Sequence, residues 1–161
     1  MIILLMGVSG VGKSTVGRSL ADRLSWRFHD ADDLHSPENV ARMRSGRPLD
    51  DEARLPWLHA VRDLIRTLAQ DGRDAVVACS ALKASYRRLL LEDVRGVCIV
   101  HLTAPAEVLQ ERVAERAGHF MPATLVESQV AALEPPADAL VVDATRPVNE
   151  VVEQIVDRLD L

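Results

Sequence analysis

The sequence predicts an α/β fold with three layers, in which helices cover both faces of a five-stranded parallel sheet. Five short apolar segments alternate with longer amphipathic segments along the 161 residues, and strands that are apolar on both faces are typical of a parallel sheet buried between helices. The length suits one core, and no linker, repeat or low-complexity tract divides the chain. We therefore expect a single domain over residues 1–161.

The N-terminal part of the chain predicts two strands and two helices. The apolar run Ile2–Met6 predicts a strand, and the recurrence of apolar residues at every fourth position of Lys13–Leu24 predicts a helix. A short second strand is expected at residues 27–29. Ser36-Pro37 is typical of a helix start, with serine as the N-cap and proline at the first helical position, and this helix should end near residue 45.

A long helical pattern over Asp51–Gln70 opens the remainder of the chain. It contains Pro56, where we expect a bend or a restart because proline lacks the backbone N–H of a helix interior. After it, three strands alternate with four helices. The strands are expected at residues 75–79, 97–102 and 139–142. The helices are expected at residues 84–92, 105–116, 122–133 and 147–159. In such a fold, ligands bind at the carboxyl ends of the strands.

Composition and charge exclude several classes of protein. The chain carries 24 acidic residues against 19 Lys and Arg, a net charge of −5, so we expect no nucleic-acid partner. The opening apolar run ends at Met6, too short to cross a bilayer, and it lacks the basic start of a signal peptide, so we expect no membrane association. Cys79 and Cys98 lie in separate apolar segments, which favours free thiols and a cytoplasmic location.

The loop after the first strand matches the phosphate-binding pattern G-x-x-x-x-G-K-[ST] at every position, between a strand and a helix. Its glycines allow the backbone to wrap an anion, with N–H groups directed to it at the positive end of a helix. Lys13 can bridge the β- and γ-phosphates of ATP, and the Ser14 hydroxyl can bind Mg²⁺. The alternative is a glycine-rich turn that only joins strand to helix. The expected ATP contacts in the loop are Gly7, Ser9, Gly10, Val11, Gly12, Lys13, Ser14 and Thr15.

The metal-binding acid that many P-loop proteins carry after the third strand is missing, because that strand ends in Cys79-Ser80. The guanine-binding N-K-x-D pattern is missing as well. Two carboxylates, Asp30 and Asp32, follow the second strand instead, and in an extended backbone they would project to the same side. We assign Asp30 to the Mg²⁺ site through a water molecule, and Asp32 to the base that takes the proton of an acceptor hydroxyl. The alternative is a solvated acidic turn.

Several segments together resemble the gluconokinase family, and the resemblance runs from the first strand to the last. These segments are the phosphate loop, Asp32-Asp33-Leu34-His35, Asp51, Arg54, Pro56-Trp57-Leu58, Cys79-Ser80-Ala81-Leu82-Lys83, Tyr86-Arg87 and Gly118-His119-Phe120. The sequence departs from the family pattern at Arg42, where Lys is common, and at Ala53, where Asp is usual. Neither position touches the expected chemistry.

The resemblance implies a fold like that of nucleoside-monophosphate kinases and Mg²⁺-dependent transfer of phosphate from ATP to the 6-hydroxyl of D-gluconate. It implies acceptor-binding helices at about residues 36–70 and a lid at about residues 112–133. Relatives are often dimers, so a homodimer is implied too. The implied acceptor contacts are His35, Arg54, Lys83, Arg87 and His119, beside Asp32.

In small kinases of this build, arginines on the lid reach the nucleotide. Arg112 and Arg116 are four residues apart and hence on one helical face. We expect Arg116 to act over the transferring phosphate, as a catalytic residue beside Lys13 and Asp32, and Arg112 to lie nearer the adenine. Alternatively both pair with acidic neighbours on a solvated helix. Arg146 and Pro147, after the fifth strand, are further candidates for adenine contacts.

Two other functions compete with this one. A shikimate-type kinase would share the two aspartates after the second strand, but the glycine triplet of that family after the third strand is replaced here by Ser80-Ala81-Leu82-Lys83. A nucleotide-binding module without turnover would not need Lys13, Asp32 and the lid arginines.

Overall fold

The computed structural model of the protein describes residues 1–115 and 123–161. In this part of the chain, five parallel strands form one sheet in the order β2-β3-β1-β4-β5, which confirms the predicted fold class. The strands are β1 (Ile2–Met6), β2 (Arg27–Asp30), β3 (Ala75–Ala78), β4 (Val97–Thr103) and β5 (Leu140–Asp143).

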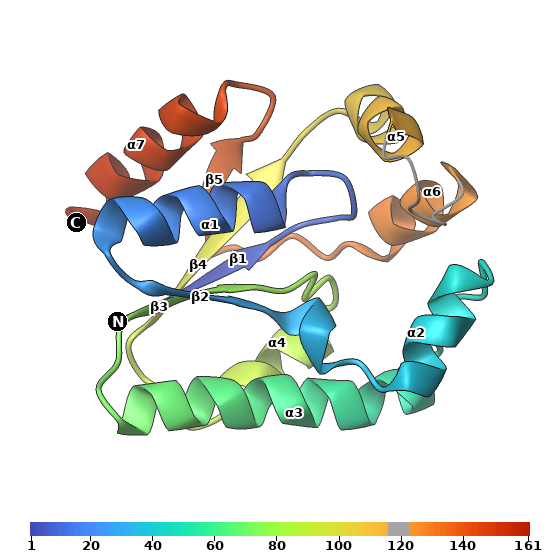
Figure 1. Cartoon of the computed structure of the whole chain (residues 1–161), viewed down its shortest axis with the longest axis horizontal. Helices are drawn as coiled ribbons and strands as arrows, with labels where there is room; N and C mark the ends of the chain where they lie inside the picture. Colours follow the sequence, from blue (N-terminus) through green and yellow to red (C-terminus); the bar gives the residue numbers. More distant parts are fainter. Residues whose placement is uncertain (116–122) are drawn as a thin grey trace.

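Helices cover both faces of the sheet (Figure 1). The helices α1 (Lys13–Leu24) and α7 (Val148–Leu159) lie on one face, and α3 (Asp51–Gln70) and α4 (Ala84–Leu91) lie on the other. Three further helices lie beyond the carboxyl ends of the strands, namely α2 (Pro37–Arg44), α5 (Ala106–Glu115) and α6 (Ala123–Ala132). Ligands are expected at this edge in open parallel sheets.

The central strand β1 divides the core in two. Ile3 and Leu5 belong to the cluster on the α1 and α7 side, whereas Ile2, Leu4 and Met6 belong to the cluster on the α3 and α4 side. All five side chains are at most 1% exposed, and burial of each contributes about 1.5–3 kcal/mol. An apolar residue at every position of β1 is therefore explained by helices on both faces.

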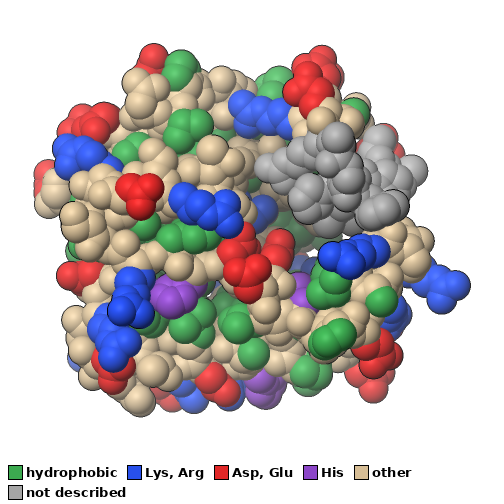
Figure 2. Space-filling view, viewed as in Figure 1, with side chains coloured by type: hydrophobic (Ala, Val, Ile, Leu, Met, Phe, Trp, Pro, Cys, Tyr) green, Lys and Arg blue, Asp and Glu red, His purple; other side chains and the backbone are tan. Residues whose placement is uncertain are grey.

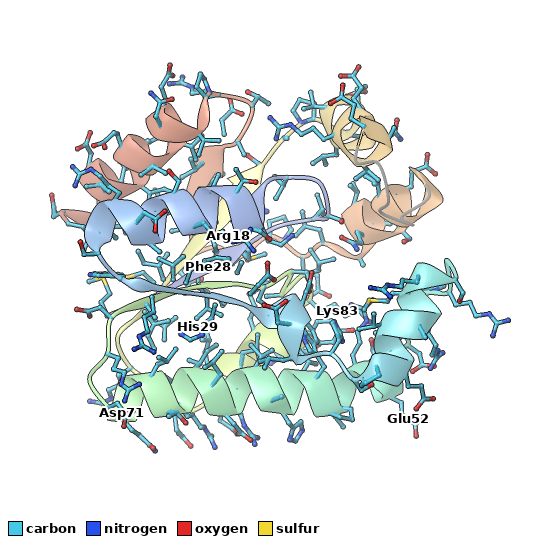
Figure 3. The ribbon with its side chains drawn as sticks, in the orientation of Figure 1. Arg18, Phe28, His29, Glu52, Asp71 and Lys83 are labelled. Carbon is cyan, nitrogen blue, oxygen red and sulfur yellow. The ribbon has the colours of Figure 1, made fainter. Side chains whose placement is uncertain are left out.

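The helix α1 lies close to β2 because Gly17 leaves room for the Phe28 ring: a Cβ at Gly17 would meet Phe28 Cε2 at 2.5 Å. The Arg18 guanidinium carbon lies 5.0 Å from the centroid of the same ring, as can be followed in Figure 3. This packing brings the start of α1 near the end of β2, and so brings the phosphate loop near the aspartates.

The helix α3 differs from the expectation at Pro56. It is one helix from Asp51 to Gln70, so the expected restart does not occur. Proline in its second turn removes a single backbone hydrogen bond near the helix start. The side chains of Trp57 and Leu58, which follow, are 3% and 2% exposed and hold this turn against the core. Elsewhere the element ends lie within one or two residues of those predicted, and Ser36 caps α2 by accepting the Asn39 N–H at 3.2 Å.

The surface drawn in Figure 2 interleaves acidic and basic side chains, with acidic ones gathered near the middle of the face. Among the described residues, no helix is long and apolar enough to cross a membrane.

Candidate active site

The phosphate loop leads from β1 into α1 through backbone conformations that favour glycine. Gly12, the N-cap of α1, has φ of 102°, a left-handed value that other residues rarely adopt. No side chain caps the start of α1 in the described part of the chain, and its first turn holds no acidic residue. The first N–H groups of the helix are therefore available to an anion, with the helix dipole favouring negative charge.

A second glycine sets the distance between this loop and α5. A Cβ at Gly10 would lie 2.8 Å from Val113 Cγ2 and 3.1 Å from the Leu109 carbonyl oxygen. Only glycine allows α5 to pack this closely on the loop, so α5 and the phosphate loop form one wall of the site.

Ser14 and Asp30 lie together at one end of the loop. The Ser14 hydroxyl donates a hydrogen bond of 2.6 Å to Asp30 Oδ2, and Asp30 Oδ1 accepts the Asp32 N–H at 3.2 Å. A hydroxyl and a carboxylate side by side, next to the place of a nucleotide's phosphates, are the oxygen ligands that Mg²⁺ prefers. Among the described residues, no group of three or more His, Cys, Asp or Glu side chains is arranged so that it could hold a metal ion by itself. The pair thus fits a metal that takes its other ligands from water and phosphate.

The segment after β2 is not extended, contrary to the premise of the sequence reasoning. Residues Ala31–Leu34 form a short 3-10 helix, capped by Asp30. Asp30 and Asp32 consequently differ in direction: Asp30 bonds to Ser14, whereas Asp32 lines a separate cleft. The 3-10 turn thus directs the two carboxylates apart, whereas an extended strand would have kept them on the same side.

This acceptor cleft joins the phosphate loop to the α2 and α3 side of the molecule. Its walls come from the loop, the turn after β2, the segment between α2 and α3, and α6. It is lined by Ser9, Lys13, Asp32, His35, Met43, Arg47, Pro48, Leu49, Arg54, Trp57, Ser80, Ser128 and Gln129. Four residues predicted for catalysis or the acceptor, Lys13, Asp32, His35 and Arg54, are therefore brought together in one cleft.

Asp32 lies at the mouth of the acceptor cleft. Its side chain is 73% exposed, yet the protein around it displaces much of its hydration, and this desolvation raises the pKa of the Asp32 carboxyl. The Lys13 ammonium lowers that pKa and the Asp30 carboxylate raises it, with the net effect upward. A carboxylate with a raised pKa is a stronger base, which suits proton abstraction.

His35 is held beneath Asp32 by stacking on Trp57. The two ring centroids lie 4.4 Å apart with the planes 9° from parallel, and the Trp57 indole N–H donates to the Ala31 carbonyl at 2.6 Å. Burial lowers the pKa of His35, so its ring is neutral at pH 7. His35 Nδ1 is buried and has no hydrogen-bond partner among residues 1–115 and 123–161, while Nε2 lies 4.0 Å from Asp32 Oδ1. The hydrogen is best placed on Nε2, where it faces an acceptor.

A second cavity adjoins the acceptor cleft and shares Arg54 and Gln129 with it. In this outer cavity Lys83 Nζ lies 2.8 Å from Asp51 Oδ1, and the Tyr86 hydroxyl donates to the same carboxylate. The hydrogen bond between Lys83 and Asp51 lowers the pKa of the Asp51 carboxyl and raises the pKa of the Lys83 ammonium. Lys83 points into the space between α4 and α2 in Figure 3.

Arg87 is not brought to either cavity. Its guanidinium donates to the carbonyl oxygens of Ala81, Leu82 and Glu134 at 2.8, 3.0 and 2.7 Å, and the residue is 7% exposed. Through these three bonds Arg87 braces the loop after β3 against the segment after α6. The contact with the acceptor that the resemblance implies for Arg87 stays a prediction.

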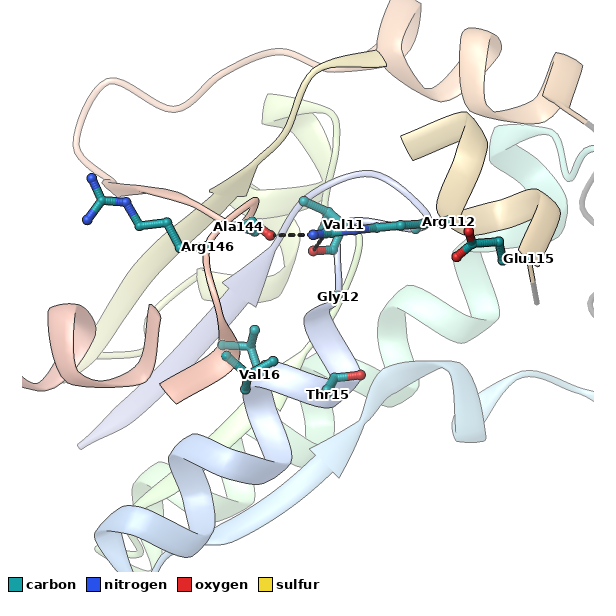
Figure 4. Close-up of a pocket in the computed structure, with 10 residues that line it drawn as sticks. Val11, Gly12, Thr15, Val16, Arg112, Glu115, Ala144 and Arg146 are labelled. Atoms are coloured by element: carbon teal, nitrogen blue, oxygen red, sulfur yellow. Dashed lines mark hydrogen bonds between the residues drawn. The ribbon is translucent and has the colours of Figure 1, made fainter. Parts of the chain in front are cut away.

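A cavity of about 380 Å³ lies on the other side of the phosphate loop, between α1, α5 and the turn after β5 (Figure 4). Arg112 reaches into it from α5 and donates to the carbonyl oxygens of Val11 and Ala144 at 3.3 and 2.9 Å. Arg146 also lines it, extending to the side opposite Arg112, and Pro147 is the N-cap of α7. Arg116 and His119 lie outside the described residues.

Sequence reasoning assigned no role to several residues of the two cavities. Arg47, Ser128 and Gln129 line the acceptor cleft, and Asp51 and Tyr86 line the outer cavity. Asp51 and Tyr86 stood in segments that carry the family resemblance, which was a usable signal. Gln129 had none, because a polar residue on an amphipathic helix is indistinguishable from a solvated one until the helix is placed.

Comparisons with known proteins agree with this geometry. A family model described as an AAA domain matches residues 2–136. A probable gluconokinase from Xenopus tropicalis is 40% identical over 178 residues, which cover 99% of this chain and 94% of that protein. A gluconokinase from Gluconobacter oxydans (strain 621H) is 47% identical over 136 residues, covering 84% and 76% of the two chains.

A solved structure adds the likeness in three dimensions. The crystal structure of a gluconokinase from Sinorhizobium meliloti 1021 superposes with a TM-score of 0.87 and 41% sequence identity, covering 98% of this chain and 90% of that one. The chain is therefore a member of the gluconokinase family of P-loop kinases.

Proposed function

We propose that this protein transfers the γ-phosphoryl group of ATP to the 6-hydroxyl of D-gluconate, giving 6-phospho-D-gluconate and ADP. The single observation that carries the proposal is the acceptor cleft, in which Lys13 of the phosphate loop and Asp32 line the same space. A kinase needs this juxtaposition of a phosphate site and a base for the acceptor. The names of the relatives supply the substrate.

In the proposed reaction, Asp32 accepts a hydrogen bond from the 6-hydroxyl and takes its proton as the hydroxyl oxygen attacks the γ-phosphorus. The bond from that phosphorus to the β,γ-bridging oxygen breaks, and ADP leaves. Lys13 and the N–H groups at the start of α1 stabilise the charge on the transferring group. Arg116, on the lid, is proposed to add a positive charge from the opposite side, and His119 a further acceptor contact.

Mg²⁺ is the proposed metal. The Ser14 hydroxyl would bind it directly and Asp30 through water, as their hydrogen bond of 2.6 Å supports. When bound, Mg²⁺ neutralises charge on the β- and γ-phosphates. The cavity beside Arg112 and Arg146 is the proposed place of the adenosine, with Pro147 at its edge.

Gluconate is proposed to lie across both cavities, with its 6-hydroxyl at Asp32 and its carboxylate toward Arg54 and Lys83. Two features support this direction. Arg54 lines both cavities, and Lys83 lies in the outer one. Cations there can bind a carboxylate by charge-assisted hydrogen bonds, whereas at Asp32 a carboxylate would be repelled.

We further propose that residues 1–161 act as one kinase domain, with residues 36–70 on the acceptor side and a lid at about residues 112–133. A cytoplasmic location is supported by the free thiols of Cys79 and Cys98. A homodimer is proposed from the resemblance alone.

The test is ADP release, measured in a coupled assay with Mg²⁺-ATP and gluconate, shikimate or buffer alone. Turnover with gluconate only is expected. Turnover with shikimate alone would mean that shikimate, and not gluconate, is the acceptor. Binding of nucleotide without turnover under any of the three conditions would overturn the kinase assignment.

A further inference from the structure

Gln129 of α6 makes a hydrogen bond to the phosphate loop. Its side-chain oxygen Oε1 accepts the Ser9 backbone N–H at 2.7 Å. The contact joins segments 120 residues apart in the sequence. Gln129 also lines both the acceptor cleft and the outer cavity, beside Ser128.

The bond to Ser9 fixes which way the Gln129 amide faces. A backbone N–H can only donate, so the atom opposite it must be the amide oxygen, and the NH₂ group must lie on the other arm of the amide. Gln129 is half-buried and lines the two cavities. Its two N–H donors are thus held at the boundary between the cavities, in a fixed orientation.

We propose that Gln129 binds the acceptor: its NH₂ group donates to a hydroxyl of gluconate between the carboxylate and the reacting 6-hydroxyl. The inference rests on the proposed function, which lays the substrate across both cavities. Gluconate carries hydroxyls along its whole chain, and a donor at the boundary between the cavities meets the middle of such a chain. Asp32 serves the reacting 6-hydroxyl and Arg54 the carboxylate, and Gln129 serves the neutral centre.

The same amide couples the placement of α6 on the phosphate loop to the selection of the acceptor. Because Oε1 is bound to Ser9, the NH₂ group is positioned only when α6 lies on the phosphate loop. A linear acceptor with hydroxyls at the right place is then selected over one that lacks them, since the oriented donors would otherwise remain unpaired.

The experiment compares Gln129→Met, Gln129→Glu and the control Gln110→Met. Gln110 lies on the neighbouring helix α5, where its amide faces Glu127 on the exposed surface, away from both cavities. For Gln129→Met we expect the KM for gluconate to rise about five- to tenfold, as for the loss of one or two hydrogen bonds to a substrate, with little change in ADP affinity measured by calorimetry.

The glutamate variant separates binding of the acceptor from a structural link. Its carboxylate can still accept the Ser9 N–H but has no N–H to donate. If Gln129 only fastened α6 to the loop, Gln129→Glu would lose less gluconate affinity than Gln129→Met, because it keeps the bond to Ser9. The proposal expects both variants to lose gluconate affinity, with Gln129→Glu the worse because its charge repels an anionic substrate.

A series of gluconates, each lacking one of the 2-, 3-, 4- or 5-hydroxyls, identifies the group that Gln129 contacts. With one member of the series the ratio of wild-type to Gln129→Met kcat/KM should fall to about one, because the partner hydroxyl is already gone. Equal ratios for all four would overturn the proposal. Failure of the wild type to phosphorylate gluconate would instead refute the proposed function, so the two failures are distinguishable.

Discussion

Replacing Trp57 by phenylalanine tests whether the turn that carries Asp32 is positioned by α3. The Trp57 indole N–H donates to the Ala31 carbonyl at 2.6 Å, and its ring stacks on His35. Ala31 is fully buried and directly precedes Asp32. Trp57→Phe keeps an aromatic ring but leaves the Ala31 carbonyl without its partner.

The loss can be sized from the burial. An unpaired buried carbonyl costs about 1–3 kcal/mol, and in a chain of this length each kcal/mol lowers Tm by about 2–4 °C. A fall of about 4–8 °C in Tm is expected for a loss of about 2 kcal/mol. Since a shift of about 1 Å in a reacting group can lower the rate by about 10²-fold, we expect kcat to fall about tenfold while the KM for ATP changes little.

Thermal unfolding followed by circular dichroism and steady-state kinetics with gluconate measure the two effects. The matched control is Trp26→Phe, because Trp26 packs on the opposite core cluster and its indole nitrogen makes no hydrogen bond among the described residues. An unchanged Tm for Trp57→Phe would refute the hydrogen-bond argument. A lower Tm with unchanged kcat would refute the positioning of Asp32 by this bond.

Three further variants and one pH profile test the site. The chain has two lysines, Lys13 and Lys83. Lys13→Ala should lower kcat by about 10²–10³-fold, whereas Lys83→Ala should mainly raise the KM for gluconate. The reverse pattern in steady-state kinetics would exchange the roles of the two lysines. Arg87→Lys should lower the free energy of unfolding by about 2 kcal/mol, since lysine lacks the planar guanidinium that donates to three backbone carbonyls. A raised KM for gluconate at unchanged stability in urea titrations would instead indicate that Arg87 contacts the acceptor. The raised pKa of Asp32 should place the acidic limb of the kcat/KM profile above pH 4, the ordinary range of an aspartate, and a limb at or below pH 4 would contradict it.

The phosphate site was predictable from the sequence because a local motif defines it. Gly7 to Ser14 fold in one loop, and Gly10 and Gly12 adopt positive φ values that glycine permits at no steric cost. The closeness of Ser14 and Asp30 was also predictable, because the loop after β1 and the end of β2 both lie at the carboxyl edge of the parallel sheet.

The acceptor site was less predictable because its residues meet only through tertiary packing. Arg87 has the charge of a substrate ligand, but its donors are used on backbone carbonyls of the loop after β3 and the segment after α6, and no periodicity indicates this. The 3-10 turn at Ala31–Leu34 was missed because the sequence Asp-Ala-Asp-Asp suits both an extended end and a capped turn. Gln129 was missed because its partner is a main-chain N–H, which has no sequence signature.

The acceptor base also carries a stability consequence with a definite sign. The pKa of Asp32 is raised in the folded protein, so the folded state binds this proton more tightly than the unfolded chain does. The free energy of unfolding therefore falls as the pH rises from the ordinary pKa of an aspartate through the raised one, and it stays lower above that range.

Asp32→Asn cannot ionise and avoids this loss of stability. At pH 7 the variant should unfold at a slightly higher temperature than the wild type, by a margin that shrinks below pH 4, while kcat falls by orders of magnitude. The gain in stability is small because the Asp32 side chain is 73% exposed and solvent screens its charge. A wild type more stable than Asp32→Asn at pH 7 would mean that the attraction of Lys13 outweighs desolvation and the repulsion of Asp30. In that case the carboxylate would be a weaker base than the mechanism requires.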